Sequence, residues 1–366
     1  MSKKLIPSLN GLRALSIIFV LAGHTELRSF HITDDPPGMQ VGVTIFFLIS
    51  GFLITWLLMQ EERQNNGRIS LKGFYIRRAF RIFPVYYTLL LVYFFLQLAG
   101  IFQFTTASWV SSLTYTKYLS PRWGEWESGH LWSLSVEEHF YLVWPTVFYF
   151  FKRFRVPFAL AVMAVVPFVR LWGHFGDLHM FTRADALMAG CLLALYYERL
   201  TGVLLTLPRV WLLLPFAVMP LSLSAKRLVK LFFPGDIPLA KMAVAFSASY
   251  GILTLLCLGL ILAISINFAN NPWFRFLNNP VMNYIGKLSY SLYIWQQMFF
   301  SDKLWPASRF PYNIAFIVIT ALLSYHLVET PFLRIKDRLR VRTRAVRIRT
   351  RAAQVRKTRI GQPVAA

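Results

Sequence analysis

Long apolar runs, separated by short polar stretches, recur along most of the chain. A run of about 20 apolar residues can cross the hydrocarbon core of a bilayer as a helix. Ten such segments can be drawn, so the pattern predicts an all-α, polytopic helical membrane protein with about ten spans. The expected segments are 8–27, 41–59, 83–102, 130–150, 156–172, 184–198, 208–224, 243–267, 284–301 and 312–328.

The distribution of Lys and Arg predicts the orientation of these helices. Cytoplasmic loops of membrane proteins are enriched in Lys and Arg, and an even number of spans leaves both termini on one side. With the N-terminus inside, 27 of the 39 basic residues fall on the inner side and 11 on the outer side. We therefore expect both termini in the cytoplasm. The first helix is expected to be an uncleaved anchor, because no small-residue cleavage site follows its apolar part.

Composition agrees with a membrane protein. Of 366 residues, 56% are hydrophobic and 15% are charged, whereas a soluble domain holds about 25% charged residues. The mean hydropathy is +0.49. Cys191 and Cys257 lie inside apolar runs, where structural disulfides are not expected. The composition excludes an ordinary soluble domain.

The C-terminal stretch 334–366 is strongly basic, with 12 Lys and Arg residues and one acid. A basic segment beside a last helix binds anionic lipid, at about 1 kcal/mol per basic residue near the surface. A disordered tail is the alternative, and nucleic acid is not an expected partner. We therefore predict two parts, a transmembrane domain over 1–333 and a basic cytoplasmic tail over 334–366.

The first apolar segment contains two ionisable residues, Arg13 and His24. They are eleven residues apart, which in a helix is about three turns plus 20° and about 16 Å, so they share one face at different depths. Ionisable residues within membrane helices mark functional sites. The alternative is that Arg13 snorkels to the headgroups and His24 caps the helix.

Two further polar clusters lie near helix ends. One, in 129–145, holds Ser133, Glu137, Glu138 and His139. Two adjacent carboxylates cannot both face lipid, so at least one should face a protein interior, unless they pair at the rim with Arg122 or Arg183. The other cluster consists of Arg77, Arg78 and Arg81. Grouped guanidinium forks suit phosphates, although the positive-inside rule alone also places arginines there.

The later segments carry further polar residues, among them Arg183, Asp185, Ser289, Tyr290 and Glu329. Each can form hydrogen bonds between helices. Together they are too many for a passive scaffold, and most fall at helix ends that can surround one cavity.

In order along the chain, these motifs resemble the membrane-bound acyltransferase-3 family, whose members transfer acyl groups to carbohydrates. The Arg-x10-His pair, the segment GVTIFFLISGFLIT and the Arg-x-x-Arg stretch of RRAFRIFP are similar to the family's first three helices. Further matching stretches are HLWSLSVEEHFYLVWP, TRADALMAG, KLSYSLYIW and ETPF.

The resemblance implies a cytoplasmic acyl-CoA donor, expected to be acetyl-CoA, as co-substrate, with no bound cofactor and no metal. It also implies a carbohydrate acceptor, an envelope or exported polysaccharide or glycolipid, and a place in the cytoplasmic (inner) membrane.

Two features depart from the family. Gln296 follows Trp295 where many relatives carry a histidine. Some relatives continue into an extracellular hydrolase-like domain, whereas here the basic tail follows, so the membrane domain is expected to act alone.

Acyl transfer to a hydroxyl needs a base and a group that stabilises the oxyanion. Imidazole, with a pKa of about 6.5, suits the base, so we assign His24, assisted by Glu137 or Glu138. Arg77, Arg78 and Arg81 are expected to hold donor phosphates, with Arg13 contacting pantetheine or pyrophosphate. The residues expected to support an acceptor cavity are Ser133, His139, Tyr141, Arg183, Asp185, Ser289, Tyr290 and Glu329. The competing hypothesis is a transporter or flippase that uses the same residues as a pathway.

Overall fold

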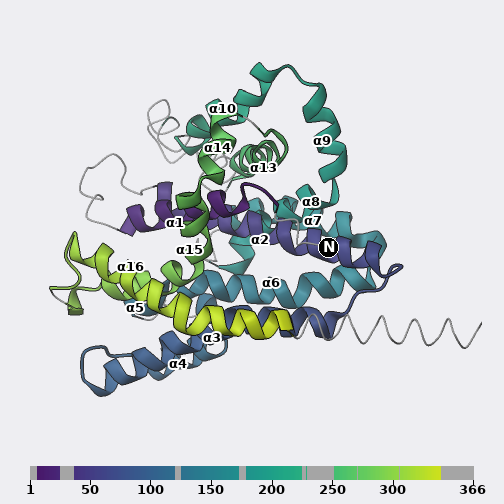
Figure 1. The fold of residues 1–366 in the computed structure, drawn as a ribbon. Helices are drawn as coiled ribbons and strands as arrows, with labels where there is room; N and C mark the ends of the chain where they lie inside the picture. The colour runs from purple at the N-terminus through teal and green to yellow at the C-terminus, as the bar shows by residue number, and fades with distance from the viewer. Residues whose placement is uncertain are drawn as a thin grey trace, which may run out of the picture.

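The computed structural model describes residues 6–24, 37–119, 125–172, 179–224, 228, 251–269, 271–304 and 306–338. All regular secondary structure in these ranges is helical, which confirms the predicted all-α class (Figure 1). The longer helices are α1 (Leu9–His24), α2 (Pro37–Gln64), α3 (Leu71–Leu98), α6 (Leu131–Phe150), α7 (Arg155–Trp172), α8 (Met180–Leu195), α13 (Ile252–Asn267), α15 (Pro280–Phe299) and α16 (Tyr312–Ser324).

Short helices connect these elements. They are α4 (Thr106–Leu113), α5 (Trp126–Gly129), α9 (Tyr197–Thr206), α10 (Leu214–Leu223) and α14 (Pro272–Asn278), the 3-10 turns η2 (Lys117–Leu119), η3 (Lys152–Phe154), η4 (Arg209–Leu213) and η5 (Asp302–Leu304), and the π turn η6 (Tyr325–Glu329). Of these, all but α10 and η4 lie outside the ten predicted apolar segments or extend beyond them.

Each predicted apolar segment overlaps a helix, but fewer than ten of the described helices qualify as spans. Four are long and apolar enough to cross a membrane alone: Met39–Gln64, Leu71–Leu98, Lys152–Leu171 and Tyr312–Arg338. Counting two bent helix pairs, α8 with α9 and α13 with α14, gives six. The count falls short of ten because α1 has only 16 residues and because α6 and α15 carry polar side chains along their length.

The last helix passes through the π turn η6 and is described as far as Arg338. The boundary at residue 333 between a transmembrane domain and a basic tail stays a prediction. Residues 339–366, which make up most of the basic tail, lie outside the described residues.

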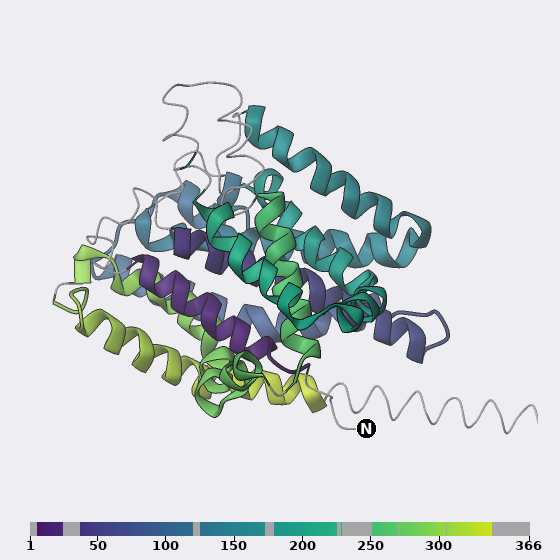
Figure 2. The ribbon, with the colours of Figure 1, turned by 90° about the horizontal axis from the view of Figure 1, so that it is seen from above.

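The centre of the structure is a closely packed group of helices in which α2 contacts α1 and α8, and α1 contacts α15 (Figures 1 and 2). Glycines allow the closest approaches. A Cβ on Gly51 of α2 would lie 1.9 Å from the carbonyl oxygen of Leu187, and one on Gly190 of α8 would lie 2.1 Å from that of Leu48. Small residues let membrane helices pack backbone against backbone, so these two positions fix the distance between α2 and α8.

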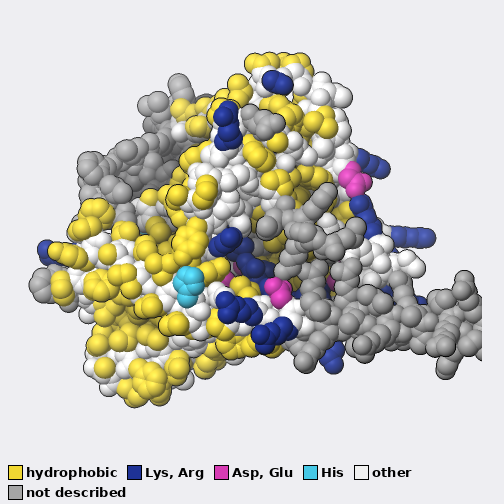
Figure 3. All heavy atoms as spheres, viewed as in Figure 1, with side chains coloured by type: hydrophobic (Ala, Val, Ile, Leu, Met, Phe, Trp, Pro, Cys, Tyr) yellow, Lys and Arg dark blue, Asp and Glu magenta, His cyan; other side chains and the backbone are white. Residues whose placement is uncertain are grey.

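Large hydrophobic side chains cover broad areas of the outer surface, whereas charged side chains gather in the lower centre and at the right of the view in Figure 3. Exposed examples on α3 and the last helix are Leu91, Phe95, Leu98, Ile319 and Leu327. Apolar patches of this extent mark contact with another molecule or a membrane. Together with the long apolar helices, they indicate a membrane protein.

We predict that Gly51→Ala and Gly190→Ala each destabilise the fold, because a methyl group at either position meets a backbone carbonyl that cannot move aside. Overpacking of this kind costs about 1–3 kcal/mol. The measurement is the melting temperature of detergent-solubilised protein. Gly259→Ala on α13 is the matched control, since nothing lies within 4 Å of its added Cβ, and equal melting temperatures for all three variants would contradict the packing argument.

Candidate active site

A cavity of about 80 Å³ lies among α1, α2, α3, α6 and α15. Its charged lining consists of Arg13, Arg78, Arg81 and Glu137. Ser133, Ser289 and Tyr290 also line it. One wall is apolar and comes largely from α2, including Val43, Phe46, Phe47 and Ile54. A cavity with a few convergent polar groups against an apolar wall is typical of a small-molecule site, and we call it the arginine pocket.

The three arginines of the pocket converge from two helices. Arg13 comes from α1, while Arg78 and Arg81 lie three residues apart on α3 and so share one face. The Arg78 guanidinium stacks over the Tyr141 ring, 3.7 Å from its centroid. Within the described ranges, the Arg78 Nε is buried without a hydrogen-bond partner.

The electrostatics of the pocket favour an anion. Arg13 interacts electrostatically with Arg78 and Arg81 as well as with Glu137 and Glu329, and Arg78 also interacts with Glu138. Of these three carboxylates, Glu137 alone lines the cavity beside the three cations. Like charges this close repel one another strongly where water is scarce. An anionic ligand would relieve that repulsion, and guanidinium forks match phosphate oxygens in geometry.

Glu137 belongs to the arginine pocket. The Ser50 hydroxyl donates a 2.7 Å hydrogen bond to the Glu137 Oε1 atom, and the Tyr141 hydroxyl donates to the Ser50 Oγ at 3.2 Å. This chain fixes the carboxylate at the edge of the cavity. The neighbouring Glu138 has a buried Oε1 atom without a partner among the described residues, and it interacts electrostatically with Arg78 and Glu137.

The supporting residues on α15 and the last helix lie close to the same cavity. The Ser133 and Tyr293 hydroxyls share a 2.5 Å hydrogen bond, and the Tyr290 hydroxyl donates to the Ile82 carbonyl oxygen at 2.7 Å, tying α15 to α3. Glu329 is buried in the π turn η6 and accepts a 2.9 Å hydrogen bond from Ser291. It interacts electrostatically with Arg81. π turns are frequent at functional sites.

His24 does not line the arginine pocket. Its Nδ1 atom lies 2.8 Å from the Val20 carbonyl oxygen. The ring stacks on Phe300 with centroids 5.6 Å apart and meets Trp126 edge-on at 6.0 Å. The sequence argument expected Glu137 or Glu138 to assist His24. In the structure, Glu137 lines the arginine pocket, whereas Trp126 of α5 and Phe300 at the end of α15 contact His24.

Eight of the predicted site residues do not line the pocket. His24 lies beyond it, and Glu138, Tyr141 and Glu329 lie close to its lining residues. The other four are Arg77, His139, Arg183 and Asp185. Arg77 pairs with Glu61 at 3.0 Å, because it points about 100° around α3 from Arg78. His139 meets the Tyr118 ring on another side of α6. Arg183 donates to Gln40 and Asp185 pairs with Arg170, so both belong to contacts between other helices. Arg122 lies outside the described residues.

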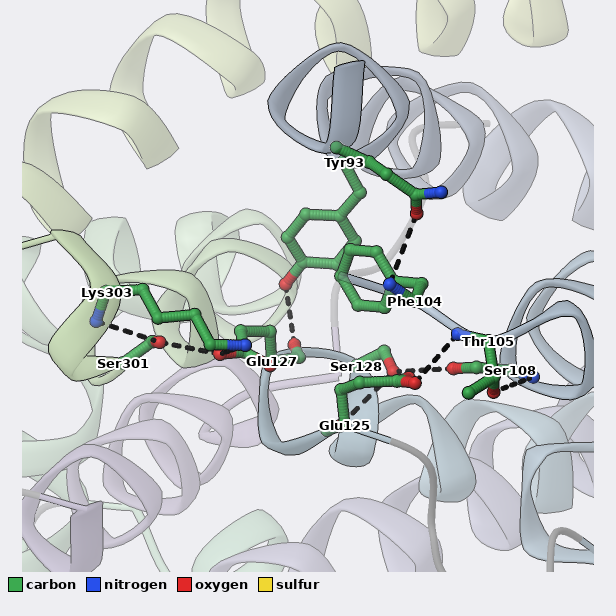
Figure 4. A network of polar contacts seen from close by, with 10 residues as sticks. Tyr93, Phe104, Thr105, Ser108, Glu125, Glu127, Ser128, Ser301 and Lys303 are labelled. Carbon is green, nitrogen blue, oxygen red and sulfur yellow. Dashed lines mark hydrogen bonds and ion pairs between the residues drawn. The ribbon is translucent and has the colours of Figure 1, made fainter. Parts of the chain in front are cut away.

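A second polar network, which the sequence did not reveal, lies around α4 and α5 (Figure 4). Glu127 is buried, accepts a 2.7 Å hydrogen bond from Ser301 and pairs with Lys303 at 3.1 Å. Close by, the fully buried Lys117 donates from Nζ to the Ser108 Oγ at 2.6 Å. In the sequence, Lys117 resembles an ordinary loop lysine, and no local pattern predicts its burial.

Among the described residues, no group of three or more His, Cys, Asp or Glu could hold a metal ion.

Residues 6–329 match the model of the acyltransferase-3 family, which describes an acyltransferase domain. The chain belongs to this family. Its curated relatives include the peptidoglycan O-acetyltransferase OatA of Listeria monocytogenes, which is 26% identical over 90% of this chain and 56% of its own length. The O-acetyltransferase OatA of Staphylococcus aureus is 27% identical over 90% of this chain and 57% of its own length.

The acyltransferase-3 chain described here thus spans a little over half the length of these relatives. No solved structure matches it significantly. The family match covers every residue that lines the arginine pocket.

We predict that Lys117 makes stability depend on alkaline pH. Burial lowers the pKa of Lys117 to about 8, with Glu125 opposing the shift, whereas an unfolded lysine has a pKa of about 10.4. The unfolded state therefore binds more protons between these values, and stability rises as the pH increases from 8 to 10. Melting temperatures of solubilised protein across this range should show the rise, and Lys117→Met should lack it.

The matched control is Lys303→Met, which removes an amine from the neighbouring ion pair at a partly exposed position. It should keep the pH dependence of the unmodified chain. A Lys117→Met variant with the same slope as the unmodified chain would show that burial does not perturb this lysine.

Proposed function

We propose that this chain is an integral-membrane O-acyltransferase that moves an acyl group, acetyl in particular, from cytoplasmic acyl-CoA to a hydroxyl of a carbohydrate. The acceptor belongs to an envelope or exported polysaccharide or glycolipid. The observation that carries the proposal is the arginine pocket, in which three guanidinium groups converge beside an apolar wall. Family membership and the names of the curated relatives support acyl transfer to oxygen.

The pocket has the chemistry that an acyl-CoA donor requires. Arg78 and Arg81 hold phosphate groups through bidentate hydrogen bonds, and Arg13 reaches the same anion from α1. The apolar wall runs along α2 from Val43 to Ile54, a length of about 16 Å. It accommodates the apolar parts of the pantetheine arm, with the thioester directed away from the arginines.

His24 acts as the general base in this proposal. It takes the proton of the acceptor hydroxyl while the hydroxyl oxygen attacks the thioester carbonyl carbon. The C–S bond then breaks, and the departing thiolate takes a proton from the imidazolium, so that the products are an ester and free CoA. The same residue can also carry the acyl group transiently as acyl-histidine. Glu137 orients the donor end of the site through the Tyr141–Ser50 chain.

The membrane arrangement is part of the proposal. Ten spans with both termini in the cytoplasm put the Arg13 end of α1 at the inner face of the cytoplasmic membrane and His24 toward the outer leaflet. This order suits a donor made in the cytoplasm and an acceptor reached from the other side. The basic residues after the last helix contact anionic lipid. A transporter or flippase gains no support from the family match.

We predict that Arg78→Ala weakens acetyl-CoA binding about 10- to 100-fold, because a hydrogen bond to a charged group contributes about 1.5–3 kcal/mol. The measurement is a thermal-shift titration of purified protein with acetyl-CoA. Arg77→Ala is the matched control, since this neighbouring arginine pairs with Glu61 outside the pocket. Equal affinities in the two variants would remove the pocket from donor binding.

We predict that His24→Ala lowers acetyl transfer at least 100-fold, the usual contribution of a general base, while acetyl-CoA still binds. The assay follows acetyl transfer to envelope polysaccharide in membranes that contain equal amounts of each variant. His139→Ala, whose ring packs against Tyr118 away from the pocket, should stay active. Full activity in His24→Ala would refute the assignment of the base.

A further inference from the structure

Helices α1 and α15 run side by side in the same direction and in constant register. The carbonyl oxygen of Asn10 lies where a Cβ on Gly286 would be, and the His24 ring stacks on Phe300. Both pairs are separated by 276 residues in sequence, so the offset is the same at the two ends of α1. Residues of α1 and α15 at equal depth along the two helices therefore differ by 276 in number.

This register places two glutamines between the arginine pocket and His24. Ser289 and Tyr293 line the pocket, and Phe300 contacts His24. Gln296 and Gln297 lie between them, one turn beyond Tyr293. Ser289 and Tyr290 are the first α15 residues that line the pocket. At 100° per residue around the helix, Gln297 points in a direction between these two residues, and Gln296 points about 20° to the other side of Ser289. Neither glutamine lines the pocket. On α2 the pocket extends to Val43, whose neighbour Gly42 lies against Val20 of α1, at the depth of Gln296.

The two amides are buried without the partners that buried amides need. Gln296 is 0% exposed and Gln297 is 3% exposed. Within the described part of the chain, neither Nε2 nor Oε1 of Gln296 has a hydrogen-bond partner, and Oε1 of Gln297 has none either. Buried polar groups in native proteins are almost always paired, and an unpaired one costs free energy that an apolar side chain would not. A ligand that supplies the missing partners explains their presence.

We propose that Gln296 and Gln297 bind the amide groups of the donor's pantetheine arm. The inference rests on the proposed function. A pantetheine arm carries two secondary amides between its phosphates and its thioester, and each offers one N–H donor and one C=O acceptor. A glutamine side chain offers the complementary pair. The order of groups along the donor is phosphate, amides, thioester, and the order along α1 and α15 is Arg13, the glutamines, His24.

The depth of the glutamines agrees with this order. By the constant offset, Arg13 lies at the depth of Ser289, and Gln296 lies seven residues farther along α15, which is about 10 Å. His24 lies beside Phe300, one further turn away. The glutamines therefore stand nearer to the reacting end than to the phosphate end, and they position the thioester carbonyl for His24.

The test compares two ligands that share phosphates and differ in the pantetheine arm. We expect Gln296→Leu to weaken binding of acetyl-CoA about 10-fold, in a thermal-shift or calorimetric titration of the full chain, and to leave binding of adenosine 3′,5′-bisphosphate unchanged. Gln297→Leu should act in the same direction. Met298→Leu, a buried change on the far side of α15, is the matched control and should alter neither affinity.

The melting temperature without ligand separates ligand binding from a structural role. If the amides serve the donor, Gln296→Leu should melt at the same temperature as the unmodified chain or higher, because it removes unpaired polar atoms. A lower melting temperature, equal losses for both ligands, or unchanged acetyl-CoA affinity would each overturn the inference. An unmodified chain that binds neither ligand would instead refute the proposed donor, so the two failures are distinguishable.

Discussion

Three arginine side chains converge inside a helical membrane domain. The rest of the site depends on the electrostatic repulsion that must be overcome to hold them there. Arg13, Arg78 and Arg81 repel one another, and of the nearby carboxylates Glu137, Glu138 and Glu329 only Glu137 lines the cavity with them. None of these three carboxylates forms a direct ion pair with the arginines among the described residues. Glu137 is instead held by Ser50 and Glu329 by Ser291. Serine hydroxyl groups therefore hold the Glu137 and Glu329 carboxylates, and the three guanidinium groups can bind a ligand in the cavity.

Such an arrangement requires a rigid frame, because cations that could move apart would do so. The frame comes from helix contacts at glycines: α2 against α8 at Gly51 and Gly190, and α1 against α15 at Gly286. At these points backbone meets backbone, and no side chain can adjust. The helices that carry Arg13, Ser50 and Tyr290 are therefore fixed by packing outside the pocket. The charged side chains project from these fixed helices, so their positions are restricted as well.

The sequence predicts much of this and misses parts for identifiable reasons. Apolar runs predict the helices, and helical spacing predicts that Arg78 and Arg81 share a face. It does not predict that Arg77 pairs with Glu61, because its partner lies on another helix. Equally, the sequence cannot decide between Glu137 and Glu138, since they are adjacent residues of the same type and only tertiary packing joins Glu137 to Ser50. The burial of Lys117 depends on Ser108 and α4, and no local pattern records it.

In the proposed reaction, the constant register of α1 and α15 also limits which donors can react. Arg13 and His24 are eleven residues apart on one rigid helix, about 16 Å along its axis, and α15 maintains the same spacing beside it. A ligand anchored at Arg13 through its anion can react at His24 only if its reactive carbon lies about that far from the anion. A free acyl phosphate is too short, because its carbonyl carbon is bonded directly to the phosphate oxygen. A donor with a long neutral arm between its phosphates and its acyl group meets the requirement, and the proposal places that arm beside Gln296 and Gln297 of α15.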